Sequence, residues 1–181
     1  GSECVAGWAT FNKIDQISLL PSQSLQLSVT TFSGQNYGAG KIDRAIKGTF
    51  GAIIIASIFG SVLLVVLQLF SSQISAFFNK DDGVLYYSRY FIRVCSLFYI
   101  IRVFNPILSG SLRGFGNAKA PMIILLFGFV VCRQLYLFVT TRLTDSFFPV
   151  SIAYPVGWTM CSLLMSIYYF YFIKKIKKGW M

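Results

Sequence analysis

The chain of 181 residues contains no histidine, and only six acidic residues accompany its 16 lysines and arginines. Its four cysteines are Cys4, Cys95, Cys132 and Cys161, and no pair of them has Cys-x-x-Cys spacing. Zinc sites and redox motifs are built from histidines and closely spaced cysteines. The sequence therefore indicates neither a metal centre nor a disulfide framework.

Charged residues are scarce, at 12% of the chain, whereas 55% of the residues are apolar and 17% are aromatic. With a mean hydropathy of +0.65, this composition lies outside the range of ordinary soluble proteins and predicts an integral membrane protein. The net charge of +10 raises the question of nucleic acid binding. Because the basic residues stand at the ends of apolar runs and not along one polar face, we expect no nucleic acid partner.

Five apolar stretches are long enough to cross the hydrocarbon layer of a bilayer as helices. They cover residues 5–33, 45–70, 84–112, 120–142 and 150–173, and short polar segments join them. The predicted fold class is therefore all-α, a polytopic bundle of five transmembrane helices, with neighbouring helices antiparallel and the lipid bilayer as their surroundings. A basic tail at 174–181 follows the last span.

The loop charges predict the orientation of these spans. Segments 34–44 and 113–119 and the tail carry lysine and arginine, whereas the alternate side balances Lys80, Arg89 and Arg142 with Glu3, Asp81, Asp82 and Asp145. Under the positive-inside rule, the basic segments are cytoplasmic. The chain begins Gly-Ser-Glu with no basic leader, so we expect no signal peptide and at least one further span upstream.

A glycine-rich segment, Gly34-Gln35-Asn36-Tyr37-Gly38-Ala39-Gly40-Lys41, separates the first two spans. Its glycines predict a turn, because glycine adopts positive φ without steric cost. A phosphate-binding loop is excluded, since Lys41 is followed by Ile42 and not by serine or threonine.

Polar residues form a stripe about 100° wide on the first span at 3.6 residues per turn. The stripe consists of Asn12, Asp15, Gln16, Gln23, Gln26 and Thr30, and Pro21 is expected to interrupt the helix between them. A carboxylate at this depth costs about 2.5 to 3.5 kcal/mol on insertion scales, so such residues usually mark ion or substrate pathways. The alternative is a helix interface held by amide hydrogen bonds.

The later spans carry further polar and small residues. Gly48, Ala52, Ala56 and Gly60 recur every four residues in the second span, which predicts close helix packing. Residues 71–83 are polar, and Asn79, Lys80, Asp81, Asp82 and Gly83 among them are expected to form an outside turn. Arg102, Asn105, Ser109 and Arg113 share one face of the third span, Arg133 and Gln134 lie in the fourth, and Thr159, Ser162, Ser166 and Tyr169 share a stripe of the fifth. Polar faces on several spans predict the wall of a shared cavity.

Three segments together resemble the multidrug and toxic compound extrusion (MATE) transporters. They are Asn12–Gln16 with Leu20-Pro21, the Gly34–Lys41 segment, and Leu108–Pro121, which reads LSGSLRGFGNAKAP and includes Gly110, Arg113, Gly114 and Gly116. The likeness covers essentially the whole chain and places it in the C-terminal lobe of a twelve-span protein, as helices eight to twelve.

The resemblance implies secondary active efflux of drugs or other organic, often cationic, small molecules, driven by a proton or sodium gradient without a bound cofactor. It also implies a multi-pass protein of the bacterial inner membrane whose partner is the missing N-terminal lobe of the same chain. Asp15, Asn12, Gln16, Gln23, Gln26, Arg102, Asn105 and Arg133 are the candidate cavity residues, and Gly34, Gln35, Gly38, Gly40, Gly110, Arg113, Gly114 and Gly116 are the candidate structural loop residues.

One departure from the family concerns the coupling cation. Several members bind it through acids on the first helix of this lobe, which is absent here, and on the helix matching 84–112, which has no carboxylate in this chain. Coupling then rests either on the missing lobe or on Asp15, the one acid within a predicted span.

Two other functions stay open at this point. The first is a flippase for lipid-linked saccharides from the same superfamily, because Arg102 and Arg133 suggest a cationic cavity. The second is a non-transporting membrane scaffold. A membrane enzyme is disfavoured, because the spans contain no Ser-Lys or paired-carboxylate arrangement and the chain has no nucleotide motif.

Overall fold

The computed structural model describes residues 2–143 and 148–179. These residues form helices joined by short connections and contain no β-strand. The helices are α1 (Ser2–Gly38), α2 (Ile42–Phe78), α3 (Asp82–Ser96), α4 (Tyr99–Arg102), α5 (Phe104–Gly114), α6 (Lys119–Leu126), the π-helical η1 (Phe127–Cys132), α7 (Arg133–Leu143) and α8 (Phe148–Lys177). The predicted all-α class is confirmed.

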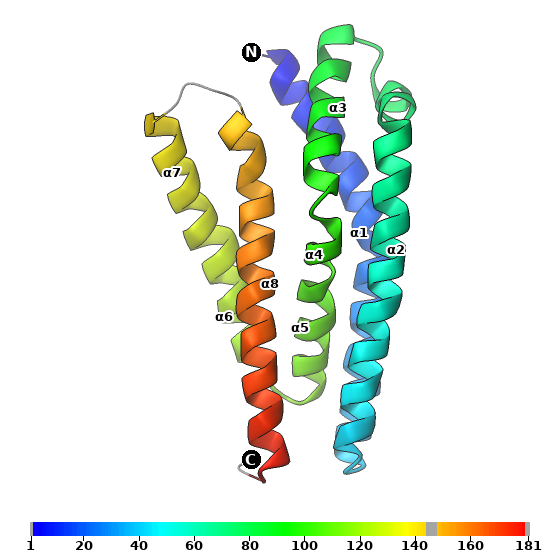
Figure 1. Ribbon diagram of the computed structural model, residues 1–181, viewed down its shortest axis with the longest axis vertical. Helices are drawn as coiled ribbons and strands as arrows, with labels where there is room; N and C mark the ends of the chain where they lie inside the picture. Colours follow the sequence, from blue (N-terminus) through cyan, green and yellow to red (C-terminus); the bar gives the residue numbers. More distant parts are fainter. Residues whose placement is uncertain (1, 144–147, 180–181) are drawn as a thin grey trace.

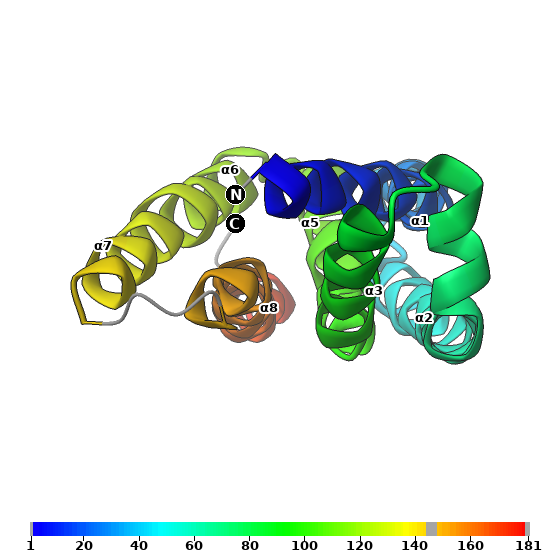
Figure 2. The same ribbon diagram turned by 90° about the horizontal axis from the view of Figure 1, so that it is seen from above.

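The helices form an elongated bundle in which successive rods run in opposite directions (Figure 1). The N-terminus and the α2–α3 connection lie at one end, and the C-terminus, the α1–α2 turn and the α5–α6 connection lie at the other. Seen from above, α1 and the α6–α7 rod occupy one side of the bundle, while α2, α3 and α8 occupy the other (Figure 2). Helix α1 packs on α2, α3 and α5, and α8 packs on α5 and α7.

Three of the described helices are long and apolar enough to cross a membrane, namely Ile42–Phe78, Lys119–Leu143 and Ser151–Lys177. The pair Asp82–Ser96 and Tyr99–Gly114, bent by 57°, adds a fourth candidate if it is one span. Helix α1, at 37 residues, is long enough but too polar to pass the same hydropathy test. The count of five spans therefore stays a prediction, and it depends on whether the polar face of α1 is shielded from lipid.

The first predicted loop is much shorter than the sequence suggested. Helix α1 continues to Gly38, so Gly34 and Gln35 are helical and only residues 39–41 connect it to α2. Helix continuation is favoured because Gly34 packs against Gly114 of α5, where a Cβ would lie 3.4 Å from the Gly114 carbonyl oxygen. Gly40 alone in this segment has the positive φ, 71°, that a turn requires.

The polar segment 71–83 is helical up to Phe78, and the outside turn predicted at its end falls on the connection between α2 and α3. Helix α2 bends at Phe70 (φ −107°, ψ 16°) and continues to Phe78. Ser75 is fully buried and its hydroxyl lies 3.0 Å from that of Ser88 in α3, so this serine faces protein and not water. The connection proper is residues 79–81, where the Asp81 carboxylate accepts a hydrogen bond from the Gly83 amide at 2.9 Å and caps α3.

The chain breaks at places other than the predicted proline. Pro21 lies inside a continuous α1, so the expected interruption there is wrong. The third span breaks instead around Phe98 (φ −94°, ψ 2°), which separates α3 from α4. The π-helical η1 interrupts the fourth span, next to the contact between Gly128 and Cys161 of α8.

Small residues allow close helix contacts, as their spacing predicted. Ala52 and Ala56 of α2 are buried in a cluster with Val103 and Ile107. Gly110 and Gly114 bring α5 against α1, because a Cβ at either position would lie 2.6 Å from a carbonyl oxygen of α1.

Gly116 and Arg113 of the second glycine segment and the lysines at the start of the tail lie at or near the surface. Gly116 (φ 84°) forms the turn after α5, and Arg113 is exposed. The tail predicted from residue 174 is helical through Lys177, because α8 extends past the predicted span. At its end, Lys177 Nζ lies 2.6 Å from Asp43 Oδ1. Residues 180–181 of that tail, and Asp145 of the predicted loop balance, lie outside the described residues.

Candidate functional site

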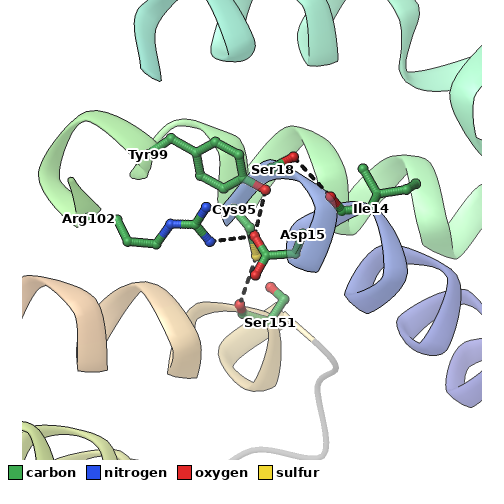
Figure 3. A network of polar contacts seen from close by, with 7 residues as sticks. All are labelled: Ile14, Asp15, Ser18, Cys95, Tyr99, Arg102 and Ser151. Carbon is green, nitrogen blue, oxygen red and sulfur yellow. Dashed lines mark hydrogen bonds and ion pairs between the residues drawn. The ribbon is translucent and has the colours of Figure 1, made fainter. Parts of the chain in front are cut away.

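The candidate site centres on Asp15, a buried acid in the middle of α1. Its Oδ1 accepts hydrogen bonds from Arg102 Nη1 at 2.5 Å and from the Tyr99 hydroxyl at 2.6 Å (Figure 3). Tyr99 and Arg102 are three residues apart on the short α4, so both reach the same side of that helix. The break around Phe98 orients this turn, because it separates α4 from the axis of α3.

The Arg102 guanidinium is held between aromatic rings as well as by the carboxylate. Its Cζ lies 4.1 Å from the centroid of the Tyr99 ring and 4.9 Å from that of Trp158 in α8. A buried charge is tolerated when it is paired and hydrogen-bonded. Asp15 is therefore a charge-compensated acid in this structure, not a free carboxylate.

A cavity of about 340 Å³ opens beside this ion pair, and we call it the central cavity. Its lining comes from α1, α4, α5, α6, η1 and α8: Asp15, Leu19, Ser22, Gln23, Gln26, Arg102, Asn105, Pro106, Ser109, Leu125, Phe129, Tyr154 and Trp158. Within the described part of the chain, the buried Asn105 Oδ1 and Ser109 Oγ have no hydrogen-bond partner. Buried polar groups are normally hydrogen-bonded. Since these two atoms lack a protein partner in that part of the chain, they are available to a polar ligand or an ion.

A second cavity of about 230 Å³, the outer cavity, lies nearer the N-terminus of α1. It is lined by Cys4, Val5, Trp8, Phe91, Arg133, Leu137, Ala153 and Tyr154. The Arg133 guanidinium carbon lies 3.7 Å from the centroid of the Tyr154 ring, and its buried Nε has no hydrogen-bond partner among the described residues. Tyr154 lines both cavities, so the two are neighbours.

The structure brings five of the eight candidate cavity residues together. Asp15, Gln23, Gln26, Arg102 and Asn105 all line the central cavity. The other three lie elsewhere: Arg133 lines the outer cavity, while the half-buried Asn12 and the exposed Gln16 line neither of the two. The stripe of α1 splits in this way because its residues spread over several turns of one long helix, of which each cavity meets only a part.

Four aromatic residues that the sequence analysis did not single out build much of this region. Tyr99 completes the Asp15 pair, Trp158 faces the guanidinium of Arg102 and Tyr154 that of Arg133. Trp8 packs against Tyr154, with the ring centroids 4.6 Å apart. The sequence carried a signal for two of these four residues. Tyr154 and Trp158 are four residues apart, so a helix places both on one face.

A protein-family model described as MatE matches residues 1–139 of the chain. The probable multidrug resistance protein YoeA of Bacillus subtilis is 26% identical over 176 residues, which are 97% of this chain and 38% of that protein. The probable multidrug resistance protein NorM of Thermotoga maritima is 24% identical over 124 residues, covering 68% of this chain and 27% of that protein.

A solved structure shares the fold. It is described as the outward-facing conformation of a multidrug resistance MATE family transporter of the MOP superfamily, and it superposes with a TM-score of 0.91 at 18% identity. The superposition covers 98% of this chain and 40% of that one. The chain thus spans about two fifths of the length of the proteins that it matches along nearly its whole length.

Proposed function

Because the chain belongs to the MatE family, we propose that it forms part of a secondary active transporter that exports drugs or other small organic molecules. Its membrane setting follows from the apolar helices, and the bacterial relatives are consistent with the inner membrane. We place the chain in the C-terminal lobe, with a further lobe of the same protein as its partner. The relatives' greater length supports this assignment.

The observation that carries the proposal is the central cavity. It lies between helices, it combines aromatic, amide and hydroxyl groups, and it holds two buried polar atoms, Asn105 Oδ1 and Ser109 Oγ, without protein partners among the described residues. Ligand sites in helical membrane proteins have this character: mostly apolar walls with a few polar groups that orient the ligand. A scaffold would close such polar faces against neighbouring helices, so the cavity argues against that alternative.

We propose that Asp15 contributes to coupling through its pair with Arg102. Protonation would remove the charge of the carboxylate and leave the guanidinium buried without a counter-ion, which is strongly unfavourable. Arg102 would then have to move or find another anion, and α4 would move with it. A sodium ion would likewise have to displace Arg102 from the same carboxylate, so coupling to either ion at this position requires Arg102 to move.

The flippase alternative receives less support than the sequence suggested. Arg102 is neutralised by Asp15, so only Arg133 adds a cation to the described cavities. No enzyme activity is proposed for this family of transporters.

Reconstitution tests the proposed function. In proteoliposomes, the full-length protein that contains this chain should move a fluorescent organic probe when a proton or sodium gradient is applied, and collapsing the gradient should stop it. Residues 1–181 alone should give no gradient-driven movement, because alternating access requires two repeats that move around a shared site. Robust transport by this chain alone would contradict the two-lobe assignment.

A further inference from the structure

We infer that the outer cavity binds small planar aromatic anions, and that the proposed transporter therefore accepts anionic aromatic substrates. The substrate part of this inference rests on the proposed function. The binding site itself rests only on the residues around Arg133.

The charges that line the two cavities are not all compensated. Five of the six acids lie in the described part of the chain, and Asp15 is the one of them that lines either cavity. The others, Glu3, Asp43, Asp81 and Asp82, stand in the first turns of helices or in connections. Since Asp15 already pairs with Arg102, the two cavities together hold one uncompensated positive charge, that of Arg133.

Arg133 has no acidic partner among the described residues. None of the ion pairs among the described residues involves it, and its contact to Tyr154 is with the face of a ring. A guanidinium presents donors in a planar fork that matches a carboxylate, sulfonate or phosphate. Arg133 as a whole is half-buried, but its Nε is buried and has no hydrogen-bond acceptor among the described residues, so this donor is available to an anion.

Aromatic rings form part of the wall of the outer cavity. Trp8 packs against Tyr154, with ring centroids 4.6 Å apart, and against Phe91, at 4.7 Å. Rings at these distances are already in contact with each other, so a further flat ring would pack against the part of Trp8 that lines the cavity and not between the rings. An anionic group on Arg133 and a ring against Trp8 would satisfy both features, whereas an organic cation would meet the charge of Arg133 in a cavity with no free carboxylate among the described residues.

The outer cavity and the central cavity lie next to each other. Tyr154 forms part of both walls, and Trp158 lies one helical turn further along α8, facing Arg102 in the central cavity. An aromatic anion that leaves Arg133 would therefore pass next to a second set of rings and to the Asp15–Arg102 pair, whose charges compensate each other. Movement between the two would keep both the charge and the ring of the ligand in contact with protein.

A matched pair of probes tests the inference. The full-length protein in lipid nanodiscs is titrated calorimetrically with naphthalenesulfonate and with naphthyltrimethylammonium, which share one ring system and differ in charge. We expect the anion to bind more tightly than the cation. Arg133→Gln should weaken naphthalenesulfonate by about tenfold or more, because a charged hydrogen bond is lost, and should leave the cation unchanged or improved.

Arg142→Gln is the matched control. Arg142 lies on the same helix, is exposed and lines neither cavity, and its guanidinium carbon lies 5.2 Å from the centroid of the Phe138 ring, so its loss should leave both titrations unchanged. Tighter binding of the cation to the wild-type protein, or equal weakening of both probes by Arg133→Gln, would overturn the inference.

Cys4 provides a second readout that needs no folded Arg133 variant. This free, half-buried cysteine lines the outer cavity, so naphthalenesulfonate should protect it from maleimide alkylation while the cation should not. No protection by the anion at saturating concentration would contradict the inference.

Transport separates this inference from the proposed function. Binding of naphthalenesulfonate that depends on Arg133, in proteoliposomes that move no probe, would support the site and reject the transporter. Gradient-driven efflux of the cation with no binding of the anion would support the transporter and reject the site.

Discussion

Asp15 is the residue on which the charge balance of the central cavity depends. Its carboxylate lies 2.5 Å from the guanidinium of Arg102 and accepts a hydrogen bond from the Tyr99 hydroxyl. The ion pair joins α1 to α4 across 87 residues of sequence. Breaking a buried pair by removing one partner costs about 3 to 5 kcal/mol, because the other charge remains buried. Both function and stability should therefore respond to changes at these positions.

We predict that Asp15→Asn impairs gradient-driven efflux by the full-length protein at unchanged expression. Asparagine keeps the size and a hydrogen-bond acceptor but cannot bind or release a proton, so coupling through this site is lost. Asp43→Asn is the control, since Asp43 is an exposed acid paired with Lys177. Normal efflux with normal pH or sodium dependence in Asp15→Asn would show that Asp15 is structural and that coupling lies in the other lobe.

At Arg102, lysine should be tolerated better than alanine. Lysine keeps the charge that Asp15 needs, whereas alanine leaves the carboxylate unpaired at a cost of about 3 to 5 kcal/mol. Thermal unfolding in detergent measures the difference. The double variant Asp15→Asn/Arg102→Gln should be less destabilised than the sum of its single variants, because it leaves no unpaired charge; strict additivity would argue against the pair.

At the scale of the elements, the contact between α1 and α5 positions the site. Gly110 and Gly114 allow α5 to approach the α1 backbone, and this approach sets the distance between Asp15 and the turn that precedes α5. The break around Phe98 then directs Tyr99 and Arg102 toward α1. The glycine-rich segment at 110–116 therefore acts first as a helix interface and only at Gly116 as a turn.

We predict that Gly114→Ala destabilises the protein by about 1 to 3 kcal/mol, the usual cost of overpacking. Its Cβ would lie 2.6 Å from the Thr30 carbonyl oxygen and 2.7 Å from the Ser33 Cβ, so the helices must separate. Gly38→Ala is the matched control: nothing lies within 4 Å of the new Cβ, and it should be neutral or slightly stabilising. Thermal unfolding followed by size-exclusion chromatography compares the two, and equal unfolding temperatures would contradict the close contact.

At the scale of the whole molecule, the two ends of the bundle differ in charge. The α1–α2 turn, the α5–α6 connection and the C-terminus lie at one end, and the N-terminus and the α2–α3 connection lie at the other (Figure 1). The first end carries Lys41, Arg44, Lys119 and the lysines after residue 173. Under the positive-inside rule, we expect this end to face the cytoplasm.

Cysteine labelling of intact cells tests this orientation in a cysteine-free version of the full-length protein. A membrane-impermeant maleimide should label Asp82→Cys and should not label Gly38→Cys until the cells are permeabilised. Both positions are exposed, so accessibility within the protein does not decide the outcome. The reverse pattern would invert the topology.

The sequence by itself determined the all-helical membrane class, the position of most helices and the family, because hydropathy, small-residue spacing and the two glycine motifs are local features of the chain. It also picked out Asp15 and Arg102, since charges are costly within apolar runs wherever the helices pack.

Only the tertiary structure decided how these residues are used. The pairing of Asp15 with Arg102, the separation of Arg133 into a second cavity and the aromatic rings around both guanidinium groups depend on the bend of the third span and on glycine contacts between helices. A helical pattern fixes which residues share a face of one helix, but not which faces meet. For the same reason, the break predicted at Pro21 was wrong, because the continuity of α1 overrides the local signal of the proline.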